Sequence, residues 1–114
     1  MNSKGRDGEG KAAEYLQTKG YEVLARNFRT RRGEIDLIVR KAGRVAFVEV
    51  KSWDVLGRDS LGEAIDRRKR RRITDAARHF LHEHPPAPGC RFAFDVILLS
   101  GRDIVHIEDA FDGD

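Results

Sequence analysis

The alternation of apolar and polar positions along the chain predicts two helices and five strands in the order αβββαββ. Apolar residues recur at helical spacing in two segments, and Asp66 suits the position that caps the start of the second helix. The predicted helices cover residues 7–19 and 67–84, and the predicted strands cover residues 21–29, 34–40, 44–51, 91–99 and 104–107. This order predicts an α/β fold in which helices flank a mixed central sheet.

The predicted strand at residues 44–51 is apolar on both faces until two charged residues appear at its end. A strand of this kind is typical of the centre of a sheet that is covered on both sides. Glu49 and Lys51 lie two positions apart, so they share the face on which Val45 and Phe47 lie. An unpaired charge in such a place costs several kcal/mol. We therefore interpret Glu49 and Lys51 as functional residues.

Asp36 lies in the preceding apolar strand, which a short turn connects to the strand of Glu49. A hairpin makes the two strands antiparallel neighbours, so we expect Asp36 and Glu49 at the same edge of the sheet. Carboxylate oxygens are suitable ligands for Mg²⁺ or Mn²⁺, and Lys51 would hold or help to activate the attacking water. This layout indicates a metal-dependent site for phosphodiester cleavage. The alternative is a solvated Glu/Lys alternation with Asp36 as an ordinary hairpin charge.

Glu9 extends the apolar stripe of the first helix, which continues through Ala12, Ala13 and Leu16. An acid on the first turn of that stripe would reach the same site as an added metal ligand. The alternative is that Glu9 only complements the positive end of the helix dipole.

Six consecutive cations open the second predicted helix. They are Arg67, Arg68, Lys69, Arg70, Arg71 and Arg72. Extending the apolar stripe backwards places Lys69 and Arg70 on the inner side, where they would lean toward the sheet edge and a phosphate. The other four would follow a nucleic-acid backbone. A second basic cluster consists of Arg29, Arg31 and Arg32. The alternative is a charged helix face that contacts only solvent.

Composition adds a preference for a polyanionic partner. The net charge is +3, but residues 103–114 carry five acids and no Lys or Arg, which leaves 22 basic and 14 acidic residues in the rest of the chain. The sequence pI near 9.3 favours nucleic acid, with solubility as the alternative reason for the charge. The 114 residues suit one domain, 1–114.

The cysteine count and the hydropathy of the chain bear on where in the cell the protein is expected. The single cysteine, Cys90, excludes an intrachain disulfide and a zinc site built from cysteines. The start of the chain has no apolar signal segment, and no stretch has the length of a membrane span. We therefore expect a cytoplasmic protein without a membrane partner.

Asp95 and the four histidines are further polar residues whose roles the sequence does not assign. Asp95 is an acid inside an apolar strand, and it would either support the site or form a salt bridge with an arginine of the second helix. The four histidines show no spacing that is typical of a metal site.

Two sequence blocks, Gly-Glu-Ile-Asp-Leu-Ile at 33–38 and Phe-Val-Glu-Val-Lys at 47–51, occur together with Gly8-Glu9 and a succession of further matches that ends at Phe111. This succession resembles the YraN family of uncharacterised bacterial proteins, which are placed in the PD-(D/E)xK nuclease-like superfamily. The resemblance implies a restriction-endonuclease-like core, similar to that of archaeal Holliday-junction resolvases. It implies Asp36 and Glu49 as metal ligands, Lys51 as the catalytic lysine and Glu9 as the helix acid that often completes such sites.

One departure from the family pattern follows Lys51. The chain reads Ser52-Trp53 where relatives often read Thr-Arg. Trp53 would stack on an unpaired base, or else pack under the following loop.

These observations favour an enzyme: a Mg²⁺- or Mn²⁺-dependent endodeoxyribonuclease that acts on branched or otherwise non-standard DNA in repair or recombination. The alternatives are a non-catalytic nucleic-acid-binding module and a helper subunit whose acidic tail docks a basic partner. DNA is preferred to RNA as the expected ligand. A homodimer and a protein partner in DNA processing are both compatible with the sequence, as are junction, flap and single-strand substrates.

Overall fold

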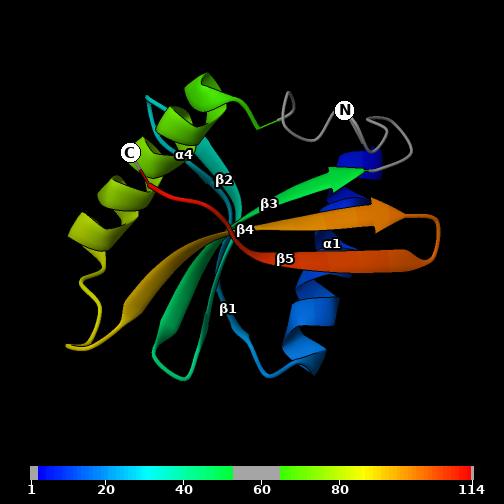
Figure 1. Cartoon of the computed structure of the whole chain (residues 1–114), viewed down its shortest axis with the longest axis horizontal. Coiled ribbons are helices and arrows are strands. Elements are labelled where there is room, and N and C mark those ends of the chain that lie inside the picture. Colours follow the sequence, from blue (N-terminus) through cyan, green and yellow to red (C-terminus); the bar gives the residue numbers. More distant parts are fainter. Residues whose placement is uncertain (1–2, 53–64, 114) are drawn as a thin grey trace.

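The computed structural model describes residues 3–52 and 65–113, and of residues 3–7 the backbone only. Its elements follow the predicted order (Figure 1). They are α1 (Ser3–Thr18), β1 (Glu22–Arg29), β2 (Glu34–Lys41), β3 (Arg44–Ser52), α4 (Arg67–Glu83), β4 (Arg91–Ser100) and β5 (Asp103–Phe111). The predicted α/β class and the order αβββαββ are confirmed.

The five strands form one mixed sheet in the order β1-β2-β3-β4-β5. Strand β3 pairs with β2 in antiparallel and with β4 in parallel orientation, while the other neighbours are antiparallel. The parallel pair needs a crossover connection, and α4 lies within it. The central place of β3 explains why its sequence is apolar on both faces.

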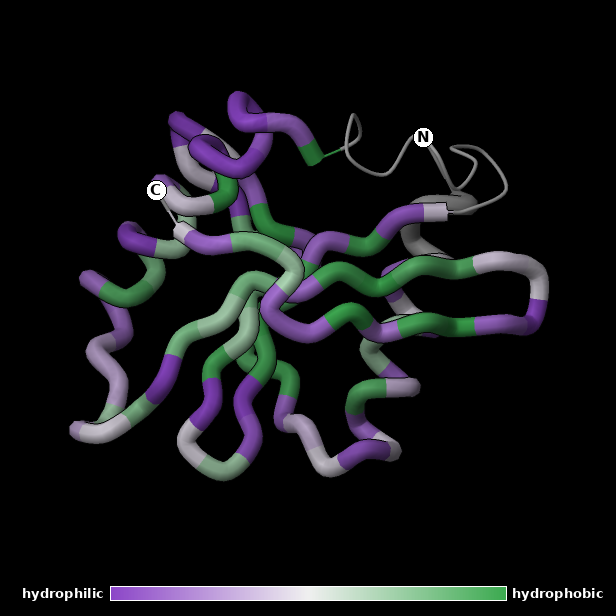
Figure 2. The backbone as a smooth tube through the Cα atoms, viewed as in Figure 1, coloured by the Kyte–Doolittle hydropathy of each residue, from purple (hydrophilic) through white to green (hydrophobic). Residues whose placement is uncertain are grey.

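The two helices cover opposite faces of the sheet. Leu16 of α1 packs with Val48 of β3 in one buried cluster, and Phe80 of α4 packs with Phe47 of β3 in another. Adjacent residues of one strand point to opposite faces, so the alternation in β3 divides the core between the helices. Figure 2 shows hydrophobic positions along the strands and hydrophilic positions at the start of α4. This architecture is consistent with a restriction-endonuclease-like core.

The ends of α4 lie where the sequence predicts them. The Asp66 side chain accepts a hydrogen bond from the backbone N–H of Lys69 at 2.9 Å, as expected of a helix cap. The cap residue at the other end is His84, whose N–H donates to the carbonyl of Phe80.

Strand β5 is longer than the predicted 104–107. Its pairing with β4 shifts register between Phe94 and Val96, and Asp109 adopts a positive φ of 51°. Such a bulge interrupts the alternation of apolar residues on which the sequence prediction relies. Among the described residues, no helix has the length and apolar character needed to cross a membrane. The cytoplasmic location stays a prediction.

Candidate functional site

Strands β2 and β3 separate at the point where Asp36 lies. Their pairing starts at Lys41 and Arg44 beside the hairpin turn and continues as far as Leu37 and Val48. One residue further, Oδ2 of Asp36 accepts the backbone N–H of Val50 at 2.8 Å. The side chain of Asp36 thus replaces the next backbone hydrogen bond between the strands. This contact holds the Asp36 carboxylate against the backbone between Glu49 and Lys51.

Glu49 is the buried centre of the site, with 8% of its side chain exposed. Its Oε1 lies 3.2 Å from Nζ of Lys51 on the same strand. The same oxygen lies 3.3 Å from Nζ of Lys69, which belongs to the first turn of α4. The sequence analysis expected Lys69 to lean toward this sheet edge, and the structure places it there, in contact with Glu49.

The acidic groups of the site repel one another. Burial, followed by the negative charge of Glu49, raises the pKa of Asp36 to about 7, although the N–H of Val50 acts in the opposite direction. Burial and the charge of Glu49 also raise the pKa of Glu9. Oε1 of Glu9 is buried and has no hydrogen-bond partner among the described residues. Glu9, Asp36 and Glu49 therefore form one electrostatic cluster, which we call the acidic cluster.

The pKa values of the two lysines are shifted in opposite directions. Burial and the neighbouring Lys51 lower the pKa of Lys69. Burial also acts to lower the pKa of Lys51, but contacts with Lys69 and with Glu49 outweigh it and leave that pKa raised. Two ammonium groups on one carboxylate oxygen interact too strongly to be independent of each other.

The chemistry of the acidic cluster fits a divalent cation. All three side chains offer hard oxygen atoms, and Oε1 of Glu9 accepts no hydrogen bond from the part of the chain that the structure describes. No group of three or more His, Cys, Asp or Glu side chains that could hold a metal ion occurs in the described part of the chain. Asp36 and Glu49 with phosphate and water oxygens would be an arrangement that Mg²⁺ accepts. Glu9 as a third ligand stays a prediction.

A pocket of about 460 Å³ opens beside Glu49, and cations of α4 line it. Arg68, Lys69 and Arg72 belong to its wall. Arg67 and Arg71 are exposed on the same turns of the helix, as the sequence analysis expected. The site therefore combines buried carboxylates with a basic rim.

Arg70 differs from the other cations of the helix start. Its Nε donates to the carbonyl of Ile65 at 3.0 Å, and its guanidinium carbon lies 5.6 Å from the centre of the Phe111 ring. The Arg70 side chain therefore makes contacts within the protein. Its predicted contact with nucleic acid stays a prediction.

The second basic cluster joins the first through Gly33. A Cβ built on Gly33 would lie 2.0 Å from the carbonyl oxygen of Arg72, so the turn before β2 packs directly on the backbone of α4. Arg31 and Arg32 in that turn are exposed, whereas Arg29 pairs with Glu34. Sequence analysis missed the role of Gly33, because a glycine that follows two arginines reads as an ordinary turn residue.

Trp53, the predicted stacking residue, lies outside the described residues. Its role therefore stays a prediction.

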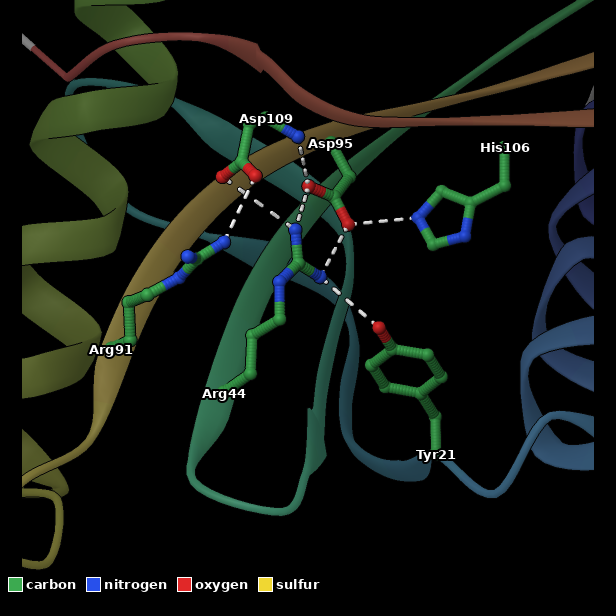
Figure 3. A network of polar contacts seen from close by, with 6 residues as sticks. All are labelled: Tyr21, Arg44, Arg91, Asp95, His106 and Asp109. Atoms are coloured by element: carbon green, nitrogen blue, oxygen red, sulfur yellow. Dashed lines mark hydrogen bonds and ion pairs between the residues drawn. The ribbon is translucent and has the colours of Figure 1, made fainter.

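Asp95 belongs to a buried network that sequence analysis did not find (Figure 3). Its two oxygens each accept a hydrogen bond from the guanidinium of Arg44 at 2.8 Å, and it also accepts the backbone N–H of Asp109 at 2.9 Å. Nε2 of His106 lies 2.8 Å from Oδ2 of Asp95, so Nε2 carries the proton. The predicted partner, an arginine of the second helix, is wrong. Arg44 at the start of β3 takes that place.

This network does not support the acidic cluster directly. Asp95 and Val48 are partners in the parallel register, and Val48 faces α1, whereas Glu49 contacts α4. Arg44 also donates a hydrogen bond from Nη1 to the hydroxyl of Tyr21 at 3.1 Å (Figure 3). The network therefore lies on the α1 face and ties β3, β4 and β5 together.

Known sequences match most of this chain. A sequence model of the family described as "Uncharacterised protein family UPF0102" matches residues 8–99. A UPF0102 protein of Persephonella marina is 42% identical over 111 residues, which are 97% of this chain and 95% of the relative. Another, from Halorhodospira halophila, is 42% identical over 95% of this chain and 86% of its own length. The protein BRADO0179 of Bradyrhizobium sp. is 46% identical over 95% of this chain and 76% of its own length. These descriptions name no activity.

Proposed function

The chain belongs to the UPF0102 (YraN) family, and we propose that it is a divalent-metal-dependent endonuclease that hydrolyses phosphodiester bonds of DNA. One observation carries the proposal: Asp36, Glu49 and Lys51 meet where β2 and β3 separate. The Asp36 carboxylate holds the N–H of Val50 at 2.8 Å, and Lys51 lies 3.2 Å from Glu49. A purely structural origin is a weak alternative, because buried, mutually repelling carboxylates cost stability.

Each residue of the site has a role in the proposed reaction. Asp36 and Glu49 would hold the divalent ion, which when bound supplies positive charge at the phosphate and makes water a better nucleophile. The ammonium group of Lys51 would donate a hydrogen bond to the attacking water and orient it in line with the leaving oxygen. The same positive charge would stabilise the negative charge that develops on the phosphate oxygens.

The basic rim supports a nucleic-acid substrate. Arg68 and Arg72 line the pocket beside Glu49, and Arg31 and Arg32 continue the positive surface across the joint at Gly33. Contacts of this kind position a backbone without reading its sequence. We propose branched or otherwise non-standard DNA in repair or recombination as the substrate, on the resemblance to archaeal Holliday-junction resolvases.

A cleavage assay tests the proposal. The purified protein is incubated with Mg²⁺ or Mn²⁺ and with four substrates of matched sequence: linear duplex, single strand, flap and four-way junction. We expect the variants Glu49→Gln and Lys51→Met to lose roughly 100-fold or more of the activity. Glu83→Gln is the matched control, because it removes a carboxylate from the far end of α4.

Selective cleavage of one branched substrate, lost in both site variants and kept in the control, would establish the function and its substrate class. Equal activity in Glu49→Gln and wild type would refute the site. Cleavage of all four substrates at similar rates would refute the preference for branched DNA.

A second candidate is a nucleic-acid-binding module without catalysis. The exposed cations of α4, including Arg67 and Arg71, favour it because they do not depend on the acidic cluster. Binding of this kind would survive chelation of divalent ions and weaken with added salt. Nuclease activity, in contrast, would stop when the ions are removed.

The third candidate, a helper subunit that docks a partner through its acidic tail, has less support. Asp109 pairs within the fold with Arg91 at 2.9 Å. Exposed acids of the described tail include Glu108 and Asp112. Loss of partner binding in a variant that neutralises both, with DNA binding intact, would favour this candidate.

A further inference from the structure

Lys69 contacts Glu49, and a cation that only binds a nucleic-acid backbone would not need this contact. Its Nζ lies 3.3 Å from Oε1 of Glu49, and Nζ of Lys51 lies 3.2 Å from the same atom. The Glu49 side chain is 8% exposed, so these contacts form away from bulk water. Two lysines from different elements, Lys51 of β3 and Lys69 of α4, thus contact the same carboxylate oxygen.

Charge balance explains why two cations gather there. Glu49 is buried, and its negative charge acts on both Glu9 and Asp36. A buried carboxylate without a cationic partner costs several kcal/mol, so the ammonium groups offset the acidic cluster whenever no divalent ion is bound. A divalent ion at Glu49 would be a third cation around the same carboxylate, and cations at such distances repel one another strongly.

Lys69 is the cation that can give way. Its side chain is 35% exposed, compared with 19% for Lys51. It also lines the pocket of about 460 Å³ between Glu49 and the arginines, so its ammonium group has room to turn away from the carboxylate.

We propose that Lys69 is a displaceable counter-ion of the acidic site: it holds Glu49 until a divalent ion binds, and the ion then releases its ammonium group toward the substrate phosphate. This inference rests on the proposed function, because it assumes a divalent ion at Glu49. Arg68 and Arg72 line the same pocket, so the released ammonium would join an existing phosphate-binding surface. Metal binding and substrate binding would thereby be coupled through one side chain.

Calorimetric titration with Mn²⁺ alone, without DNA, tests the proposal on the chain of 114 residues at pH 8. The variant Lys69→Met should bind Mn²⁺ about tenfold more tightly than wild type, because a competing positive charge is gone. Lys69→Arg, which keeps the charge, should bind within about threefold of wild type. Arg102→Met is the control, since it removes one exposed cation from the turn before β5 and should also stay within about threefold. Lys69→Gln is a second neutral variant in case Lys69→Met does not fold.

The outcomes separate this inference from the proposed nuclease activity. Equal or weaker Mn²⁺ binding in the two neutral variants, with binding present in wild type, would overturn the counter-ion and leave the metal site in place. Mn²⁺ binding in neither wild type nor neutral variants would overturn both. Tighter binding in the neutral variants without any DNA cleavage would support the counter-ion and refute the nuclease.

Discussion

Replacing Asp95 with Asn should destabilise the fold strongly, although the two side chains have nearly the same shape. Asp95 is fully buried and accepts hydrogen bonds from Arg44 and from the N–H of Asp109, with His106 at 2.8 Å. Asn keeps one acceptor oxygen, but it loses the charge and presents an NH₂ group to the guanidinium. Arg44, whose side chain is 15% exposed, would then keep only the more distant carboxylate of Asp109, 3.7 Å away, as a partner of opposite charge.

Two arguments set the size of the effect. Burial by itself would raise the pKa of Asp95, but the contacts with His106, Arg44 and the N–H of Asp109 lower it to about 2 from its ordinary value of 3.8. This difference corresponds to about 2 kcal/mol of folding free energy at neutral pH. Removing one partner of a buried ion pair adds the cost of the charge left behind, which gives a total of about 3–5 kcal/mol.

Urea unfolding followed by circular dichroism at pH 7 measures this difference. Asp103→Asn is the control, because Asp103 is an exposed acid at the start of β5. The double variant Asp95→Asn with Arg44→Met should recover part of the loss, since it also removes the cation that has lost its nearest carboxylate. A loss below about 1 kcal/mol in Asp95→Asn, or no recovery in the double variant, would refute the reasoning.

The pH dependence gives a second check on the same residue. Because the pKa of Asp95 is lower in the fold than in the unfolded chain, its contribution is complete above pH 3.8 and disappears as the pH falls toward 2. The difference between wild type and Asp95→Asn should shrink in that window. A difference that stays constant between pH 5 and pH 2 would contradict the assigned charge.

The remaining predictions concern packing and the acidic site. Gly33→Ala should lower the free energy of unfolding by about 1–3 kcal/mol, because its Cβ would lie 2.0 Å from the carbonyl oxygen of Arg72. The Cβ of Gly10→Ala in α1 would meet no atom of the described residues within 4 Å, so this change should instead stabilise the helix by about 1 kcal/mol, and thermal unfolding of the two variants should move in opposite directions. The pKa of Asp36 in the fold, about 7, exceeds its ordinary 3.8, so ionisation costs stability as the pH rises between these values. Asp36→Asn should therefore raise the free energy of unfolding by about 3–4 kcal/mol at pH 8 and by less than about 1 kcal/mol at pH 4, and an equal effect at both pH values would contradict the burial of charge beside Glu49.

Much of the fold follows from the sequence because its local signals agree. The apolar stripe of Ile73, Ala76, Ala77 and Phe80 predicts the buried side of α4, and Asp66 predicts where that helix begins. The end of β5 was not predictable in the same way. Its bulge at Asp109 is stabilised by the carboxylate of Asp95, a residue of another strand, and a local pattern contains no sign of that contact.

The amino-acid sequence was enough to predict the helices and strands, the two-sided burial of β3 and the positions of the charged residues within apolar strands. It could do so because side-chain periodicity and turn residues act over a few neighbouring positions. The contacts between distant segments became visible in the folded protein: Lys69 pairs with Glu49, Arg44 pairs with Asp95, and the turn at Gly33 packs on α4. These partners come from distant parts of the chain, and packing of the helices on the twisted sheet sets the distances between them.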